Sequence, residues 1–196
     1  MRTIAVLIFF AANLAAQTAP AYTPLTSSER WEHYRRETFL SPGLYFAALG
    51  AAGGTQLAKD PPEWGQGLSG YGKRAASFLA TYAIQSTVHE GAAAALGYDP
   101  RYLHCDCKGG ARRMAHVFVW SFLTKNEEGR IRFNSPSVAG AYAGEMLPYL
   151  WYPGRYSPWK DGFREGSQEI GIIVGVNIFR EFGPELKRFF RLTPNP

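Results

Sequence analysis

Small residues recur four positions apart along this 196-residue sequence. Glycines show the spacing at Gly50/Gly54, Gly140/Gly144, Gly162/Gly166 and Gly171/Gly175, and alanines show it at Ala47/Ala51, Ala76/Ala80 and Ala139/Ala143. Positions four apart lie on one face of a helix, and a glycine inside a helix costs about 0.5–1 kcal/mol relative to alanine. The pattern therefore predicts close helix crossings. It suits both a compact soluble bundle and helices in a membrane, and with 21 glycines in the chain some pairs arise by chance.

Capping signals predict where the helices begin. Thr26-Ser27-Ser28-Glu29 has the hydroxyl and the carboxylate of a capping box and predicts a helix over residues 27–38. Ser-Pro pairs at 41–42, 135–136 and 157–158 place a hydroxyl before a proline that suits the first helical position. They predict helices over residues 42–58, 136–151 and 158–182, the last ending at Gly183-Pro184. Apolar patterning adds helices over residues 69–96 and 110–124.

The chain contains no set of alternating segments long enough to build a sheet. Residues 125–133 read as a charged turn around Glu128-Gly129 followed by a brief alternation. No composition shift divides the chain into two cores. We therefore expect an all-α, single-domain bundle of about six helices with close small-residue crossings, which occupies residues 26–196.

The N-terminus has the layout of a cleaved secretory signal. Arg2 precedes an apolar stretch at residues 4–12, and small residues follow at Ala15, Ala16 and Ala19. We expect a signal peptide over residues 1–16, with cleavage between positions 16 and 19, and a flexible leader over 17–25. An uncleaved anchor is disfavoured, because an apolar helix over residues 4–16 spans only about 20 Å of a hydrocarbon core of about 30 Å. The expected location is the periplasm or an envelope membrane.

Charge and export narrow the choice of partner. The formal charge is +5, and removal of Arg2 with the signal leaves +4, which allows only modest attraction to anionic lipid headgroups. Export argues against nucleic acid. Tyrosines and tryptophans gather between residues 142 and 159, and such side chains favour membrane interfaces as well as half-buried corners. A membrane surface, an envelope protein or a second copy of the chain remain as partners, and no cofactor is predicted.

His89 and Glu90 are adjacent on the long helix predicted over residues 69–96. They do not form a zinc helix, because position 93 is Ala93 rather than histidine. Neighbouring helical residues also point about 100° apart. A hydrolytic site would therefore need a further carboxylate, such as Glu145 or Glu169, brought in by folding. The simpler interpretation is a partly buried polar pair.

Glu165 and Glu169 are four residues apart and would repel each other if both were ionised on one helix face. They are an acid/base pair in one interpretation. In the other they are solvated, or paired with Arg155, Arg164 or Lys160.

The densest set of soft ligands is His104, Cys105 and Cys107, with His116 further on. These four donors match zinc in number, but one residue between the cysteines is fewer than the usual two to four. Cysteines of an exported protein are more often oxidised. We expect a disulfide, either Cys105–Cys107 or between two chains, with free thiols and a metal site as alternatives.

Several short motifs resemble a group of uncharacterised exported bacterial proteins over residues 40–182. They are Gly70-Tyr71-Gly72-Lys73-Arg74, Asp99-Pro100-Arg101-Tyr102, Arg113, Thr124, Phe133-Asn134-Ser135, Gly140 and Trp151-Tyr152-Pro153. The resemblance implies an all-helical envelope domain and supplies no catalytic residue. The segment around Cys105 and Cys107 departs from that pattern.

Two structural roles follow from the residues themselves. Asp99 and Arg101 would order the central loop, and Asn134 and Ser135 would cap the next helix. We expect an exported protein with a structural or scaffolding role at or near a membrane, without catalysis. The alternatives are a small envelope hydrolase that uses His89 and Glu90, and a redox or metal site at Cys105 and Cys107.

Overall fold

The computed structural model describes residues 22–189, so the predicted signal peptide and its cleavage site lie outside the described residues. The chain is mainly helical, which confirms the all-α class. Its α-helices are α2 (Ser27–Phe39), α3 (Pro42–Leu57), α4 (Leu68–Leu96), α5 (Gly110–Trp120), α6 (Ser135–Met146) and α7 (Phe163–Phe189). Shorter elements are the helical turns η1 (Pro62–Trp64), η2 (Leu147–Leu150) and η3 (Pro158–Gly162), and the strands β1 (Leu123–Lys125) and β2 (Ile131–Phe133).

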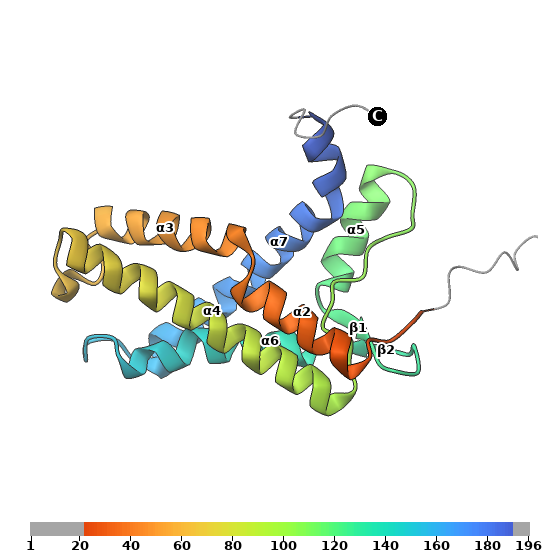
Figure 1. Cartoon of the computed structure of the whole chain (residues 1–196), viewed down its shortest axis with the longest axis horizontal. Helices are drawn as coiled ribbons and strands as arrows, with labels where there is room; N and C mark the ends of the chain where they lie inside the picture. Colours follow the sequence, from red (N-terminus) through yellow and green to blue (C-terminus); the bar gives the residue numbers. More distant parts are fainter. Residues whose placement is uncertain (1–21, 190–196) are drawn as a thin grey trace, which may run out of the picture.

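The long helix α4 is the centre of the bundle. Helices α2, α3 and α6 pack against α4, and α7 packs against both α6 and α5 (Figure 1). Helix α3 runs back along α4, whereas α7 crosses behind α4 and extends toward α5 (Figure 1). Helices α3 and α7 therefore diverge from each other, and α4 lies between them (Figure 1).

Most helix ends follow the local signals. The capping box of α2 is present: Glu29 N donates to Thr26 Oγ1 (3.3 Å), and Thr26 N donates to Glu29 Oε2 (2.8 Å). Helix α4 ends at Leu96 and is followed by the C-cap residue Gly97, whose φ of 65° is the left-handed conformation that glycine adopts at helix ends. Ser41 and Ser157 precede helices α3 and η3 as predicted, but neither side chain makes a capping hydrogen bond.

Three predicted boundaries were wrong. Helix α5 ends at Trp120 rather than at residue 124, because residues 123–125 pair antiparallel with residues 131–133. Helix α6 ends at Met146, and Pro148 lies in the 3-10 turn that follows. Helix α7 continues through Gly183-Pro184 to Phe189. Arg113 of α5 binds Glu181 and Glu185 on either side of this proline, which holds that turn of α7 against α5.

The predicted close crossings are observed at two of the four glycine pairs. A Cβ atom on Gly140 would lie 2.7 Å from the carbonyl oxygen of Gln85 in α4, and a Cβ on Gly144 would lie 2.8 Å from Gln85 Cβ. Gly162 and Gly166 meet α6 in the same way. The pairs Gly50/Gly54 and Gly171/Gly175 have no atom within 4 Å of an added Cβ, so they face open space.

Within residues 22–189, no helix combines the length and the hydropathy that crossing a membrane requires.

Candidate functional site

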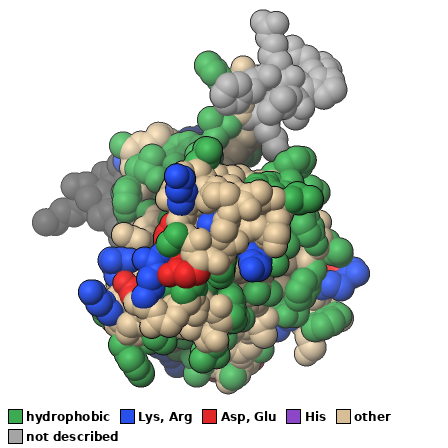
Figure 2. Space-filling view, turned by 90° about the vertical axis from the view of Figure 1, so that its left-hand side faces the viewer, with side chains coloured by type: hydrophobic (Ala, Val, Ile, Leu, Met, Phe, Trp, Pro, Cys, Tyr) green, Lys and Arg blue, Asp and Glu red, His purple; other side chains and the backbone are tan. Residues whose placement is uncertain are grey.

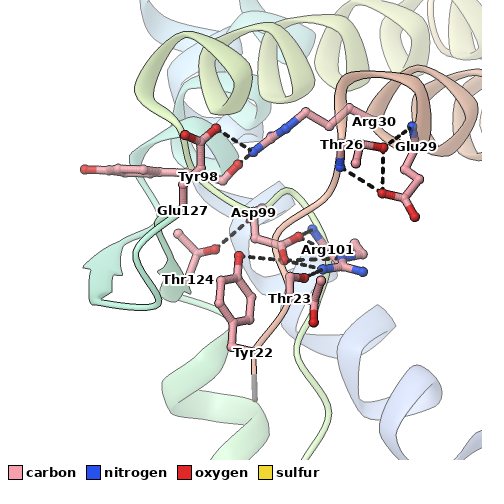
Figure 3. A network of polar contacts seen from close by, with 10 residues as sticks. All are labelled: Tyr22, Thr23, Thr26, Glu29, Arg30, Tyr98, Asp99, Arg101, Thr124 and Glu127. Atoms are coloured by element: carbon pink, nitrogen blue, oxygen red, sulfur yellow. Dashed lines mark hydrogen bonds and ion pairs between the residues drawn. The ribbon is translucent and has the colours of Figure 1, made fainter. Parts of the chain in front are cut away.

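A polar network orders the loop after α4, where Asp99 is buried (Figure 3). Arg101 donates to both oxygens of the Asp99 carboxylate, with Nη2 at 2.6 Å from Oδ2 and Nε at 2.9 Å from Oδ1. The hydroxyl of Thr124 in β1 donates to the backbone carbonyl of Asp99 (2.6 Å). Tyr22 and Thr23 belong to the segment predicted as a leader, and both reach this loop: the Tyr22 hydroxyl donates to Asp99 Oδ2 (3.0 Å), and Arg101 Nη2 donates to the Thr23 carbonyl (3.2 Å).

The network fixes the charge of its members. Burial alone would raise the pKa of Asp99, but the hydrogen bonds from the Arg101 side chain and backbone outweigh it and lower the pKa below its usual value. Burial, together with the negative charge of Asp99, raises the pKa of Tyr22 to about 12. Asp99 is therefore an ion-paired carboxylate, and the Tyr22 hydroxyl that contacts it keeps its proton near neutral pH.

A second buried carboxylate, Glu181, connects α7 to the loop that carries the cysteines. Arg113 Nε (2.9 Å), the Tyr102 hydroxyl (3.1 Å) and the backbone N–H of Cys105 (3.2 Å) all donate to its side chain. Burial would raise the pKa of Glu181, but these donors, with Arg113 the strongest, lower it. Glu181 did not stand out in the sequence, because a single glutamate on a helix carries no signal of its distant partner.

Cys105 and Cys107 form a disulfide with each other. The two histidines predicted as further ligands bind carbonyls instead: His104 Nε2 lies 3.3 Å from the carbonyl of Arg180, and His116 Nε2 lies 2.8 Å from that of Leu103. No group of three or more metal-binding side chains converges within residues 22–189. This segment is therefore a short disulfide-closed loop that contacts α7.

Asn134 and Ser135 divide the capping role differently from the prediction. The Asn134 side chain accepts a hydrogen bond from the N–H of Ser137 (3.3 Å) and is the N-cap of α6. Ser135 is the first residue of that helix, and Pro136 follows it. The asparagine fills the capping position one residue earlier than the Ser-Pro signal suggested.

His89 and Glu90 point to different cavities, as their adjacent places on α4 require. The Glu90 carboxylate lies 2.9 Å from His33 Nδ1 of α2 and lines a surface cavity beside Trp31. The His89 side chain faces α6, and its Cβ is 3.0 Å from the position that a Cβ on Gly140 would occupy. Burial lowers the pKa of His89. The two residues therefore do not form a joint catalytic pair.

A groove of about 510 Å³ opens between α3 and α7 above α4. One wall is formed by α3, where the residues are small or aliphatic, and the other by Ile172 and Val176 of α7. Four carboxylates also line it, and two of them, Glu145 of α6 and Glu169 of α7, come from different helices that meet there. Folding thus unites the two residues that the sequence offered only as alternative contributors to a site.

These two carboxylates lack the cations that hold Asp99 and Glu181. Glu145 has no hydrogen-bond or ion-pair partner within the described part of the chain, and Glu169 accepts one hydrogen bond, from Gln85 Nε2 (2.9 Å). Desolvation, with smaller contributions from the charges of Glu169 and Glu165, raises the pKa of Glu145 to about 7. Desolvation also raises the pKa of Glu169.

Glu165 and Glu169 have different surroundings, and of the partners expected for them Arg164 lies near Glu165. Glu165 accepts a hydrogen bond from the Tyr149 hydroxyl (2.6 Å) and lies 3.4 Å from Arg164 Nη2. Glu169 instead turns into the groove and pairs with no cation. A shared helix does not equalise them, because their surroundings come from different neighbouring elements.

Helix α3 presents a second candidate surface, since residues 41–58 contain no Asp, Glu, Lys or Arg. Ala48 and Ala52 are buried against the bundle, whereas Tyr45, Phe46 and Leu49 are 49%, 75% and 50% exposed. Leu57 at the end of α3 and Leu68 at the start of α4 are each 87% exposed. Figure 2 looks at this end of the molecule and shows hydrophobic side chains around much of its margin, with charged ones at several places on the face.

The apolar surface contrasts with a core of small and polar residues. Among residues 22–189, the buried hydrophobic side chains are Ala48, Ala52, Ala93, Val117 and Ala141. Exposed large apolar side chains, such as Trp159 and Phe179, occur on almost every helix. Isolated exposed apolar residues are ordinary, but contiguous ones mark a contact surface for a partner or a membrane.

No protein-family model, curated protein or solved structure matches this chain. The resemblance to exported bacterial proteins accordingly stays a prediction.

Proposed function

We propose that the protein is an exported structural component of the cell envelope that binds a membrane surface through α3 and the end of the α3–α4 hairpin. The observation that carries the proposal is a helix without charged residues on the surface of the bundle. A helix that is apolar on all sides is normally covered, either by protein or by lipid.

Two features favour lipid as the covering material. Leu57 and Leu68 are the most exposed large apolar side chains of α3 and α4, and both lie at the free end of the hairpin (Figure 1). Lys59 lies in the same turn and is exposed, which suits a basic side chain that reaches the headgroups while its neighbours enter the apolar boundary. Tyr45 adds a side chain with an apolar body and a polar end, of the kind enriched at membrane interfaces.

Vesicle flotation of the mature chain tests the proposal. We expect the protein to float with vesicles of phosphatidylglycerol and phosphatidylcholine, and Phe46→Asp to weaken the partition at least about tenfold, because a buried Phe contributes about 1.5–3 kcal/mol. Phe118→Asp on α5 is the matched control, since Phe118 is 54% exposed but belongs to the opposite part of the bundle.

The same question can be asked in cells. A carbonate wash of fractionated cells separates embedded from peripheral protein, and we expect the chain in the peripheral fraction. Recovery of all the protein in the soluble periplasm without detergent, or equal effects of Phe46→Asp and Phe118→Asp on flotation, would contradict the proposal.

A further inference from the structure

The groove between α3 and α7 has the size and composition of a ligand site. Its volume of about 510 Å³ lies within the range of small-molecule pockets, about 300–1,000 Å³. Its walls are apolar: Leu44, Ala47 and Ala51 come from α3, and Ile172 and Val176 from α7. The small side chains of α3 keep the groove open where larger ones would fill it.

The cations that line the groove are already engaged. Arg74 is buried and donates to the carbonyls of Asp60 (2.9 Å) and Pro61 (2.7 Å) and to Gln56 Oε1 (2.7 Å). At the other end of the groove, Arg180 Nη2 lies 3.3 Å from Glu37 Oε2. Neither guanidinium pairs with Glu145 or Glu169, so the groove contains two acidic groups without a neutralising partner.

Asp60 is the remaining one of the four carboxylates that line the groove, and it is also engaged. Asp60 accepts a hydrogen bond from the Tyr156 hydroxyl and lies 3.4 Å from Arg155 Nη2. The uncompensated negative charge of the groove therefore belongs to Glu145 and Glu169 alone among its described lining residues. A ligand group that complements these two carboxylates is positively charged.

A smaller cavity of about 150 Å³ continues from the groove, and both are lined by Gln85, Glu169 and Val176. His89 lines this cavity, and its Nε2 is buried without a hydrogen-bond partner among the described residues. Buried polar atoms are nearly always hydrogen-bonded in native proteins. The orphaned imidazole nitrogen lines the same cavity as Glu169 and is a second, independent sign that the site lacks a polar group.

We propose that this groove binds a primary ammonium group attached to an apolar chain, with the ammonium between Glu145 and Glu169 and the chain along α3 and α7. An ammonium has three donors and no acceptor, so it can serve two carboxylates at once. Charge-assisted hydrogen bonds of this kind are about twice as strong as neutral ones. A metal ion fits less well, because no set of three or more metal ligands converges in residues 22–189.

Calorimetry on the mature chain at slightly alkaline pH tests this site with octylammonium as the probe. Octanol and octanoate have the same chain with a neutral and a negative head, and we expect both to bind at least about tenfold more weakly. Glu145→Gln and Glu169→Gln should each weaken octylammonium binding about tenfold and leave octanol binding unchanged. Glu128→Gln is the control, because Glu128 is exposed in the hairpin turn, away from the groove.

The amine can come from a soluble molecule or from an aminolipid headgroup. Vesicles that contain phosphatidylethanolamine, compared with vesicles of phosphatidylcholine alone, distinguish these sources. A preference for phosphatidylethanolamine that Glu145→Gln abolishes assigns the lipid, and octylammonium binding without that preference assigns a soluble amine. Equal affinity for octylammonium and octanol, or unchanged octylammonium affinity in both glutamine variants, would overturn the proposal. The calorimetry needs no membrane, so its outcome is independent of docking through α3.

Discussion

Two regions of this molecule contain carboxylates that are shielded from water, and the pKa values of these carboxylates shift in opposite directions. In the loop and hairpin region, Asp99 and Glu181 each have an arginine partner, and their pKa values are lowered. In the groove, Glu145 and Glu169 have no cation, and their pKa values are raised. The difference teaches that carboxylates of the first region are neutralised within the chain, whereas Glu145 and Glu169 form no ion pair with the arginines that line the groove.

The glycine pairs show a second contrast. Gly140 and Gly144 are covered by α4, and their missing side chains are what allows α6 to approach. Gly50 and Gly54 on α3, with Gly171 and Gly175 on α7, have the same spacing and touch nothing. The small-residue face of α6 is therefore closed by α4, whereas those of α3 and α7 stay open.

The largest expected effect comes from breaking the completed region. Asp99→Ala should lower the free energy of unfolding by about 3 kcal/mol, because it leaves the Arg101 guanidinium and the Tyr22 hydroxyl without their acceptor. Urea denaturation followed by circular dichroism measures the change. Glu128→Ala removes an exposed ion pair with Arg130 and should cost less than about 1 kcal/mol. Similar losses in both variants would show that the network contributes little.

One substitution placed at two sites sharpens the glycine comparison. Gly140→Ala should destabilise the fold by about 2 kcal/mol, because its Cβ meets the backbone carbonyl of Gln85 at 2.7 Å. Gly54→Ala should stabilise the fold by about 0.5–1 kcal/mol, since alanine favours the helix and nothing lies within reach. Thermal unfolding of the two variants gives shifts of opposite sign. Shifts of the same sign would contradict the difference between the crossings.

The smallest expected effect is a difference between the two regions in how their carboxylates make the free energy of unfolding depend on pH. Folding raises the pKa of Glu145 from 4.5 to about 7, so its destabilising contribution grows as the pH rises through this window and is complete above it. Glu145→Gln should therefore stabilise the protein by about 1–2 kcal/mol at pH about 8, after allowance for partial solvent screening, and change little at pH about 4. Asp99 and Glu181 have lowered pKa values and behave oppositely: their stabilisation is lost as the pH falls below about 4.

Unfolding measured across the pH range tests this sign. The wild-type protein should lose stability through Glu145 between about pH 4.5 and about pH 7, and Glu145→Gln should flatten the profile over that range. An unchanged slope over that range in the variant would mean that Glu145 is fully solvated.

Local signals predicted much of the helical framework. The capping box at Thr26 and Gly97 at the end of α4 act within a few residues, so they could be read directly from the chain. The end of α7 could not be read in this way. Gly183-Pro184 is an ordinary stop signal, and it fails here because Arg113, about 70 residues earlier in the chain, holds the turns on both sides of it.

The sequence by itself determined that α3 carries no charge and that small residues recur at helical spacing. Only the tertiary structure decided which small-residue faces close and which carboxylates meet a cation. Glu145 and Glu169 lie on different helices, and so do Arg113 and Glu181. The spacing of these residues in the sequence does not show that Glu181 has an arginine partner and that Glu145 and Glu169 have none. The physical reason is range: caps and turns depend on neighbours along the chain, whereas burial and charge compensation depend on how α4, α6 and α7 cross.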